Sequence, residues 1–276
     1  VKKEFVAGGF FVPQAKGGVS WKDRNTLLVW TDFGPGTLTT SGYPRQVKIW
    51  HRGTPLSGAR PLFEGQQTDM SVGAGVDHQP ERQYLFVNRR MTFYTGHIFV
   101  MEGDKLIRLD IPEDADFNGI FKNQMLIELK SDWSTGGRTW RQGSLISIDY
   151  DRFLMGDRNF SVVFEPGERS SLAGMTTTKN ALLLLKMNNV ISELWRYTLD
   201  EGQWRGVRVA APNLGTIGLA ATDDQSDHLF FTFTNYLEPT SLYYFPADGK
   251  NIRKVKSLPA FFDAGKLMVE QLEAVS

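Results

Sequence analysis

The sequence predicts an all-β protein built from repeated four-stranded units, and three observations support this fold class. Short runs of β-branched, aromatic and aliphatic residues recur along the chain, separated by turns rich in Gly, Pro, Asn and Asp. Helical periodicity is almost missing. The same order of elements returns roughly every 50 residues, a period typical of β-propeller blades. A β-sandwich would explain the strands but not this repetition, so we favour a propeller of about five four-stranded antiparallel blades.

The first unit, residues 18–64, shows the pattern most clearly. Residues 26–31 (TLLVWT) form an apolar, β-branched run that is typical of a buried strand. Residues 46–51 (QVKIWH) alternate between polar and apolar, as expected for a strand with one solvated face. Short strands at 18–21 and 61–64 complete the unit.

Four more units with the same order of elements are expected along the 276 residues, at 70–111, 116–166, 171–209 and 215–258. In the third of these five units, residues 134–138 form an insertion at a hairpin tip, and residues 151–157 are compatible with a single helical turn. Residues 71–76 (SVGAGV) are small and suit a crowded first strand.

The two ends of the chain are expected to lie outside these units. Residues 1–6 are predicted to be the last strand of a preceding blade, and Phe10, Phe11 and Val12 are expected to pack against the body. Residues 267–275 are predicted to be an extra strand that leaves the last blade. Since the chain opens without Met, we interpret it as a piece of a longer protein.

Composition excludes several function classes. Lys+Arg and Asp+Glu are equal at 31 each, so no global charge recruits nucleic acid or an acidic membrane. Cysteine is absent, which excludes disulfides, thiolate zinc sites and a cysteine nucleophile. That composition fits a reducing compartment, and we expect a cytoplasmic protein. No apolar run approaches the roughly 18 residues of a spanning helix, and the first residues do not resemble a secretory signal.

Catalytic and cofactor motifs are not evident in the sequence. None of the four histidines, at His51, His78, His97 and His228, stands at the spacing of a local zinc pair, and each is interpreted as structural or solvent-exposed. There is no Gly-x-Ser-x-Gly elbow, no P-loop and no GxGxxG after a strand. We therefore predict no catalytic residue, no metal site and no cofactor.

Two sets of charged residues leave alternatives open. Loop carboxylates could converge as the acid pair of a glycosidase, although such aspartates more often cap turns; they are Asp69, Asp132, Asp149, Asp151, Asp223, Asp224 and Asp227. The basic tips Arg89-Arg90 and 138–141 (RTWR) lack systematic aromatic interleaving. Solvated loops or intrachain contacts are favoured over nucleic-acid binding at these tips.

Three stretches in combination resemble one known family. The first joins residues 19–21 to 26–36 (TLLVWTDFGPG) and 40–45 (TSGYPR). Residues 47–56 (VKIWHRGTPL) resemble a His-x-x-Gly-Thr-Pro hairpin, and residues 235–243 (NYLEPTSLY) resemble a segment with Leu, Pro and Tyr before a domain crossing. Residues 257–264 and 269–271 match the crossing itself. Together they are similar to the propeller of the prolyl oligopeptidase family, over essentially the whole chain.

That resemblance implies a seven-bladed propeller capping an α/β-hydrolase domain with a Ser–Asp–His triad, open only to short peptides. The chain would then begin at the end of the second blade, and residues 267–276 would start the crossing to a hydrolase domain that these 276 residues lack. Its expected partners are that domain and short peptides. The family often places an aromatic substrate contact where this chain has Lys16, so no substrate-binding residue is carried over.

Three functions compete on this basis. The leading one is the gating propeller of a prolyl oligopeptidase-like serine endopeptidase, inactive without its hydrolase domain. The second is a stand-alone propeller that binds protein partners, and the third is a propeller glycoside hydrolase. Because a chain with fewer blades than its parent would expose two sheet faces, a homodimer of this chain is also expected.

Overall fold

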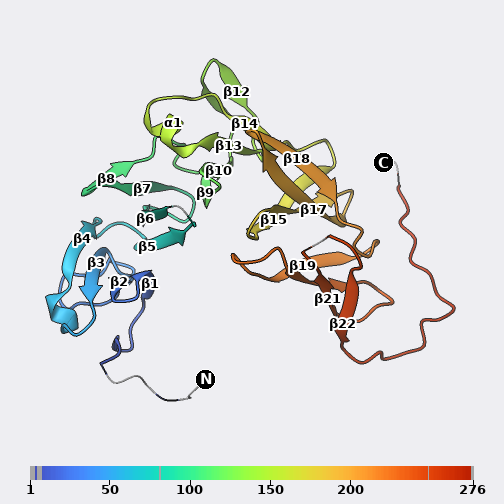
Figure 1. The fold of residues 1–276 in the computed structure, drawn as a ribbon, viewed down its shortest axis with the longest axis horizontal. Helices are drawn as coiled ribbons and strands as arrows, with labels where there is room; N and C mark the ends of the chain where they lie inside the picture. The colour runs from blue at the N-terminus through green and yellow to red at the C-terminus, as the bar shows by residue number, and fades with distance from the viewer. Residues whose placement is uncertain (1–3, 5–7, 81, 248, 275–276) are drawn as a thin grey trace. The chain divides into compact units, whose positions relative to one another are not determined.

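The computed structural model describes residues 4, 8–80, 82–247 and 249–274 (Figure 1). Apart from Glu4, the strand predicted at 1–6 lies outside these residues. The chain falls into two compact units, one of residues 1–120 with 150–156 and the other of residues 121–149 with 157–276. Each unit is described separately below.

Strands within the described ranges form five four-stranded sheets and one two-stranded hairpin. Four of the sheets follow the sequence order of their strands, each strand pairing with the next one along the chain. The strands of the remaining sheet, β9, β10, β13 and β14, also follow the sequence order. The small hairpin β11-β12 is inserted in the chain between the second and third of these strands. The predicted all-β architecture of four-stranded antiparallel sheets is confirmed.

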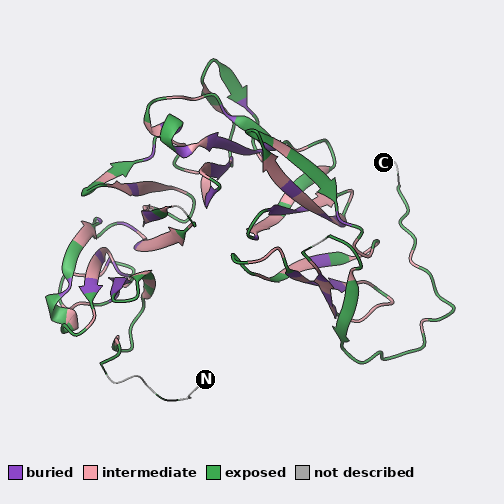
Figure 2. Cartoon of the chain, in the orientation of Figure 1, coloured by how far each residue is buried: buried purple, intermediate pink, exposed green. Residues whose placement is uncertain are grey.

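The first unit contains two complete sheets. The first sheet consists of β1 (Gly18–Asp23), β2 (Thr26–Trp30), β3 (Gln46–His51) and β4 (Arg60–Glu64), with a 3-10 turn at Leu56–Gly58. The second consists of β5 (Ser71–His78), β6 (Gln83–Arg90), β7 (Gly96–Glu102) and β8 (Lys105–Arg108). Figure 2 shows that the buried residues concentrate in the inner strands of each sheet, whereas the last strands are largely exposed.

Strand β2 is buried on both faces because successive side chains of a strand point to opposite sides. Leu28 packs toward the second sheet, in a cluster with Val72 and Val87. Leu27 and Val29 belong to a separate cluster on the other face. This double burial explains the uninterrupted apolar run of the sequence in this strand.

Phe10 and Phe11 were both expected to pack against the body, and only Phe10 does so. The Phe10 ring contacts the Trp50 ring edge-on, with the two ring centroids 4.8 Å apart, whereas the Phe11 side chain is 76% exposed. Since these two side chains are adjacent in the chain, only one of them faces the sheet. The expectation for Phe11 was therefore wrong.

Two polar contacts join the two sheets of the first unit. Ser20 Oγ on β1 accepts the backbone N–H of Val76 on β5 at 3.1 Å. His78 Nε2 donates to the Trp21 carbonyl at 2.8 Å. The first strands of the two sheets, β1 and β5, therefore lie side by side. This arrangement brings the beginnings of these two strands close to one another.

The predicted helical turn is present as α1 (Tyr150–Leu154), which belongs to the first unit although its neighbours in sequence belong to the second. Tyr150 and Phe153 are its buried residues. No helix in the described part of the chain is long and apolar enough to cross a membrane.

The remaining strands lie in the second unit, apart from residues 116–120 of β9, which belong to the first. One sheet consists of β9 (Asp116–Phe121), β10 (Gln124–Glu128), β13 (Leu145–Asp149) and β14 (Ser161–Phe164). Next come β15 (Ser170–Thr177), β16 (Leu182–Asn188), β17 (Ile191–Asp200) and β18 (Gln203–Arg208). The last sheet is β19 (Thr216–Thr222), β20 (Leu229–Thr234), β21 (Ser241–Phe245) and β22 (Arg253–Ser257).

The four consecutive leucines of β16 show how the core of the second unit is built. Leu182 and Leu184 pack with Phe164 of β14. Leu183 and Leu185 face the opposite way, into a cluster with Phe231 of β20. A strand buried between two neighbouring sheets therefore requires a continuous apolar run rather than alternation.

Tight turns account for the short connections between strands. Lys122 and Asn123, between β9 and β10, have φ of 49° and 60°. Asn189 and Val190, between β16 and β17, have φ of 47° and 59°. Positive φ at both central residues is the type I′ geometry, whose twist matches that of a hairpin.

The insertion predicted around 134–138 is the hairpin of β11 (Trp133–Thr135) and β12 (Arg138–Trp140). Its tip is Gly136-Gly137, with φ of 61° and 74°. The Trp133 and Trp140 rings contact Phe160 edge-on at 5.1 and 5.7 Å, which anchors the hairpin to the body of the second unit.

The strand predicted at 267–275 was wrong over its described part, because residues 267–274 are irregular. A strand needs a partner for its backbone N–H and C=O groups, whereas here the contacts are made by side chains. Glu273 Oε1 accepts from Arg169 Nη1 at 2.6 Å and from Asn189 Nδ2 at 2.8 Å. The side chain of Gln271 also bonds to the Asn189 carbonyl.

Candidate functional site

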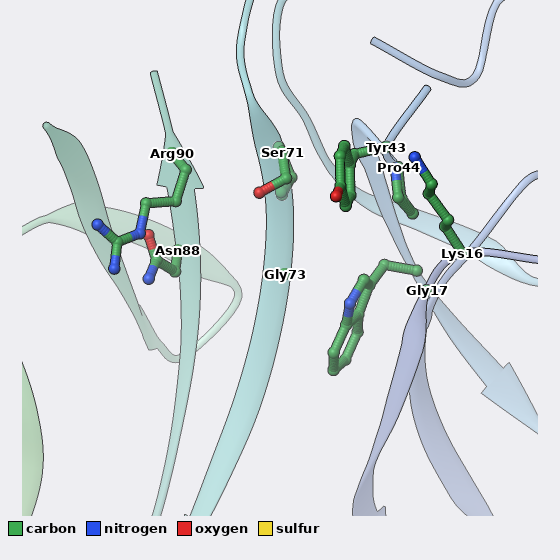
Figure 3. Close-up of a pocket in the computed structure, with 10 residues that line it drawn as sticks. Lys16, Gly17, Tyr43, Pro44, Ser71, Gly73, Asn88 and Arg90 are labelled. Atoms are coloured by element: carbon green, nitrogen blue, oxygen red, sulfur yellow. The ribbon is translucent and has the colours of Figure 1, made fainter. Parts of the chain in front are cut away.

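A pocket of about 470 Å³ lies at one end of the two sheets of the first unit (Figure 3). The beginnings of β1 and β5 and the ends of β2 and β6 meet there, together with the loop before β3. The pocket is lined by Lys16, Gly17, Trp30, Tyr43, Pro44, Ser71, Val72, Gly73, Asn88 and Arg90. No carboxylate belongs to this lining.

The register of β5 and β6 determines which side chains reach the pocket. Ser71 is paired with Arg90, and Gly73 is paired with Asn88. Residues directly opposite in an antiparallel pair, and residues two apart on a strand, share one face. Ser71, Asn88 and Arg90 therefore project on the same side of this hairpin.

Arg89 points to the other face of β6 and is fully engaged. Its Nε and Nη2 donate to the two carboxylate oxygens of Asp69 at 2.8 and 2.9 Å. Asp69 Oδ2 also accepts the backbone N–H of Gln66 at 2.6 Å. Burial acts to raise the pKa of Asp69, but the hydrogen bonds from Arg89 and Gln66 outweigh it and the pKa is lowered.

The opposite wall of the pocket depends on a close backbone approach. Gly17 has φ of 156°, and a Cβ there would lie 2.2 Å from the Trp30 carbonyl oxygen, so a side chain is excluded. Lys16, the residue before it, extends over the Tyr43 ring with Nζ 4.0 Å from the centroid. Figure 3 shows Lys16 and Tyr43 on one side and Asn88 and Arg90 on the other.

The chemistry available in this pocket is binding rather than catalysis. Ser71 is its hydroxyl-bearing residue besides Tyr43, and no histidine or carboxylate lines the pocket to activate it. Nucleophilic catalysis needs a base within hydrogen-bond reach of the nucleophile. Two cations and several hydrogen-bond donors suit an anionic ligand instead.

The four histidines are each engaged with a neighbouring group. His51 Nδ1 hydrogen-bonds with Thr26 Oγ1 at 3.3 Å, and His78 bonds to a backbone carbonyl as described above. His97 Nε2 donates to Glu113 at 2.7 Å, and His228 Nδ1 bonds with the Tyr244 hydroxyl at 2.6 Å. Among the residues described, no group of three or more His, Asp or Glu could hold a metal ion.

The loop carboxylates act as caps and ion-pair partners. Asp227 accepts Thr178 Oγ1 at 2.8 Å and the Asn180 backbone N–H at 2.7 Å, which ties the β15–β16 loop to the β19–β20 loop. Asp132 caps the Gln142 N–H and Asp223 caps the Gln225 N–H, each at 2.7 Å. Asp149 accepts from Asn123, Asp151 from Arg82 and Asp224 from Gln225.

These contacts favour the capping interpretation of the carboxylates over a glycosidase acid pair. The second basic tip also makes intrachain contacts, since Arg141 Nη1 donates to the Pro166 carbonyl at 3.1 Å and Arg138 stacks over Trp140.

One partly buried polar network was not anticipated from the sequence. The Tyr150 hydroxyl on α1 and Arg82 Nη2 both donate to Glu102 Oε1, at 2.5 and 2.6 Å. Arg82 Nη1 also donates to Asp151 at 2.8 Å. Burial, followed by the hydrogen bond to Glu102, raises the pKa of Tyr150. The network fastens α1 to the second sheet, so we interpret its role as structural.

The repeated four-stranded antiparallel sheets are those of a β-propeller domain. A family model described as "Prolyl oligopeptidase, N-terminal beta-propeller domain" matches residues 11–257, and the chain belongs to that family. The resemblance noted in the sequence is thereby confirmed.

Curated relatives and solved structures agree with this assignment. The chain is 35% identical to the uncharacterized peptidase y4nA of Sinorhizobium fredii and 24% identical to the uncharacterized peptidase RP174 of Rickettsia prowazekii. Both alignments cover the whole chain but only 39% and 40% of the relatives.

Among solved structures, a post-proline cleaving enzyme from Rickettsia typhi superposes with a TM-score of 0.85 at 22% identity, over 95% of this chain and 40% of that one. Oligopeptidase B from Leishmania major gives 0.65 at 14%, over 93% of this chain and 36% of that one. At these identities the structures support the fold alone.

Proposed function

We propose that this chain is the substrate-gating propeller of a prolyl oligopeptidase-like serine endopeptidase that acts on short peptides. The match of residues 11–257 to the propeller family carries the proposal. The relatives named as peptidases are more than twice as long as this chain. In this division of labour, a hydrolase domain supplies the catalytic groups and the propeller decides what reaches them.

The segment after β22 supports a hydrolase domain of the same protein as the partner. Phe261 is 93% exposed and Met268 is 79% exposed, and Leu258, Phe262 and Leu272 are also exposed. Large apolar side chains that are exposed along one segment are candidates for an interaction site. A second domain packed on this segment would cover these side chains.

The first test separates the propeller from the hydrolase activity. The isolated 276-residue chain is expected not to cleave a Gly-Pro reporter peptide, because peptide hydrolysis needs an activated nucleophile and an oxyanion site. The protein encoded by the longer reading frame is expected to cleave it and to be blocked by a serine-directed phosphonate. Phosphonate-sensitive cleavage by the isolated chain would refute this assignment of roles.

The second test addresses gating. The longer protein should cleave short proline-containing peptides but spare the same sequence placed inside a folded protein. Its hydrolase domain expressed without residues 1–276 should lose this discrimination. Equal discrimination with and without the propeller would show that gating lies elsewhere.

We further propose that the isolated chain forms a homodimer. Val19 and Trp21 are 46% and 50% exposed on one face of β1, on the first sheet, and a second copy packed on that face would cover them. Sedimentation velocity at tens of micromolar should show the dimer; a clean monomer would contradict it.

A cytoplasmic location is proposed from the absence of cysteine in all 276 residues, which fits a reducing compartment. Fractionation of cells that produce the tagged full-length protein tests it. Recovery from the periplasm or medium would exclude this location.

A further inference from the structure

Two cations line the pocket of the first unit, and within the described chain neither is neutralised by a carboxylate. The Lys16 ammonium lies over the Tyr43 ring, and Arg90 Nη1 donates to the Phe93 carbonyl at 3.4 Å. The neighbouring residue Arg89, in contrast, is neutralised, because its guanidinium donates to both carboxylate oxygens of Asp69. The lining of this pocket therefore carries two positive charges, on Lys16 and Arg90, and no carboxylate.

Two acidic residues share a neighbouring pocket with Arg90. Glu113 and Asp116 line a smaller neighbouring pocket of about 70 Å³, in which Arg90 is a shared wall. Glu113 is already bonded to His97. Neither carboxylate lines the larger pocket. Like charges gathered in a concave surface focus the potential and raise the local concentration of anions.

The uncharged lining adds hydrogen-bond donors at fixed positions. The Asn88 amide and the Ser71 hydroxyl project from the same face of the β5–β6 hairpin as Arg90, as the register requires. A carboxylate accepts two parallel bonds from a guanidinium, and its remaining lone pairs suit an amide, a hydroxyl or an ammonium. Gly73, which is paired with Asn88, has no side chain, and a Cβ there would lie 3.6 Å from the Trp30 ring.

The aromatic lining and the size indicate what carries the carboxylate. Trp30 and Tyr43 offer apolar surface beside the cations. A volume of about 470 Å³ falls within the range of small-ligand pockets, so it accommodates one or two residues of a peptide.

We propose that this pocket binds a carboxylate of a short peptide, with Lys16 and Arg90 as the recognising cations, so that the propeller favours acidic peptides. The inference rests on the proposed function for its supply of short peptides, and adds a charge preference to it. The carboxylate comes either from an acidic side chain or from the C-terminus of the peptide.

Three hexapeptides of otherwise identical sequence distinguish these sources. The first has a central Glu and blocked ends, the second has Gln in its place, and the third has that Gln with a free C-terminal carboxylate. Their dissociation constants for the 276-residue chain are measured by calorimetry in 50 mM and 500 mM NaCl. We expect the Glu peptide, the free-carboxylate peptide or both to bind about tenfold more tightly than the neutral one. High salt should reduce this preference.

Matched variants test which residues are responsible. Lys16→Gln and Arg90→Gln should each remove part of the preference, and the double variant should bind all three peptides equally. Lys105→Gln, an exposed lysine on β8, is the control and should keep the preference. Thermal unfolding of each variant verifies that its fold is retained.

Two negative results have different meanings. If neutral and acidic peptides bind the wild-type chain equally, or if the double variant keeps the preference, the carboxylate site is refuted while the gating function stands. If no peptide binds and the longer protein cleaves no short peptide, the proposed function fails and the site fails with it.

Discussion

Arg89 and Arg90 are neighbours on β6, but their guanidinium groups lie on opposite faces of that strand and in different environments. Arg89 forms a two-pronged ion pair with Asp69, whose side chain is only 4% exposed. Arg90 faces an open pocket and bonds to one backbone carbonyl. The first arrangement contributes to stability, whereas the second leaves charge available for a ligand.

Removing the acidic partner of Arg89 should have the largest effect on stability. Asp69→Ala leaves a partly buried guanidinium without its counter-charge and the Gln66 N–H without its acceptor. Loss of one member of such a pair typically costs about 3 kcal/mol. Urea unfolding of wild type and variant measures this difference.

Asp104→Ala, at the exposed β7–β8 turn, is the control and should change the free energy of unfolding by less than about 0.5 kcal/mol. A similarly small loss in Asp69→Ala would mean that the ion pair contributes nothing.

The contribution of the Asp69–Arg89 ion pair to the free energy of unfolding should decrease at acidic pH, because Asp69 becomes protonated. The hydrogen bonds of Asp69 hold its pKa below the unfolded value of about 3.9. Its contribution to stability is therefore complete above that pH and is lost as the pH falls through the lower, folded-state pKa. Asp69→Asn lacks this titration, so its deficit relative to wild type, about 2 kcal/mol at pH 7, should shrink below about pH 4.

Unfolding curves for both proteins between pH 7 and pH 3 give this deficit. Asp227 and Glu238 also have lowered pKa values and titrate in both proteins, so their effect cancels in the difference. A deficit that stays constant over this range would exclude the lowered pKa.

The other end of the same strand offers a smaller test. Arg82, just before β6, and Tyr150 both donate to Glu102. Tyr150→Phe removes one donor and leaves the ion pair with Arg82, so we expect a loss of about 1 kcal/mol in the free energy of unfolding. Tyr94→Phe, on a residue that is 83% exposed, should be neutral. A variant as stable as wild type would show that Arg82 alone satisfies Glu102.

The sheets could be predicted from the sequence because their signals are local. The leucines of β16 and the Lys122-Asn123 turn specify a buried strand and a hairpin without information from elsewhere in the chain. The irregular conformation of residues 267–274 could not be predicted from local signals. Their apolar content resembles a strand, but whether a partner strand exists depends on the rest of the fold.

The pocket could be predicted only in part, because five separated segments of the chain build it. Strand alternation alone requires Arg89 and Arg90 to face opposite sides. The sequence does not show which side holds Asp69, and it does not bring Lys16 near Arg90. The interpretation of the tip as an intrachain contact was correct for Arg89, while Arg90 lines a pocket.

The sharpest comparison, and the smallest expected effect, is the substitution of Arg90 itself. Arg89→Gln should lower the free energy of unfolding by about 2 kcal/mol, because Asp69 would remain buried without its cation. Arg90→Gln should change it by less than about 0.5 kcal/mol, since its one backbone contact is exposed and no carboxylate among the described residues is paired with it. The two variants make the same chemical change at adjacent positions, so composition and net charge are matched. Equal losses at both positions would mean that Arg90 also supports the fold, and the distinction between a structural face and a binding face of β6 would have to be abandoned.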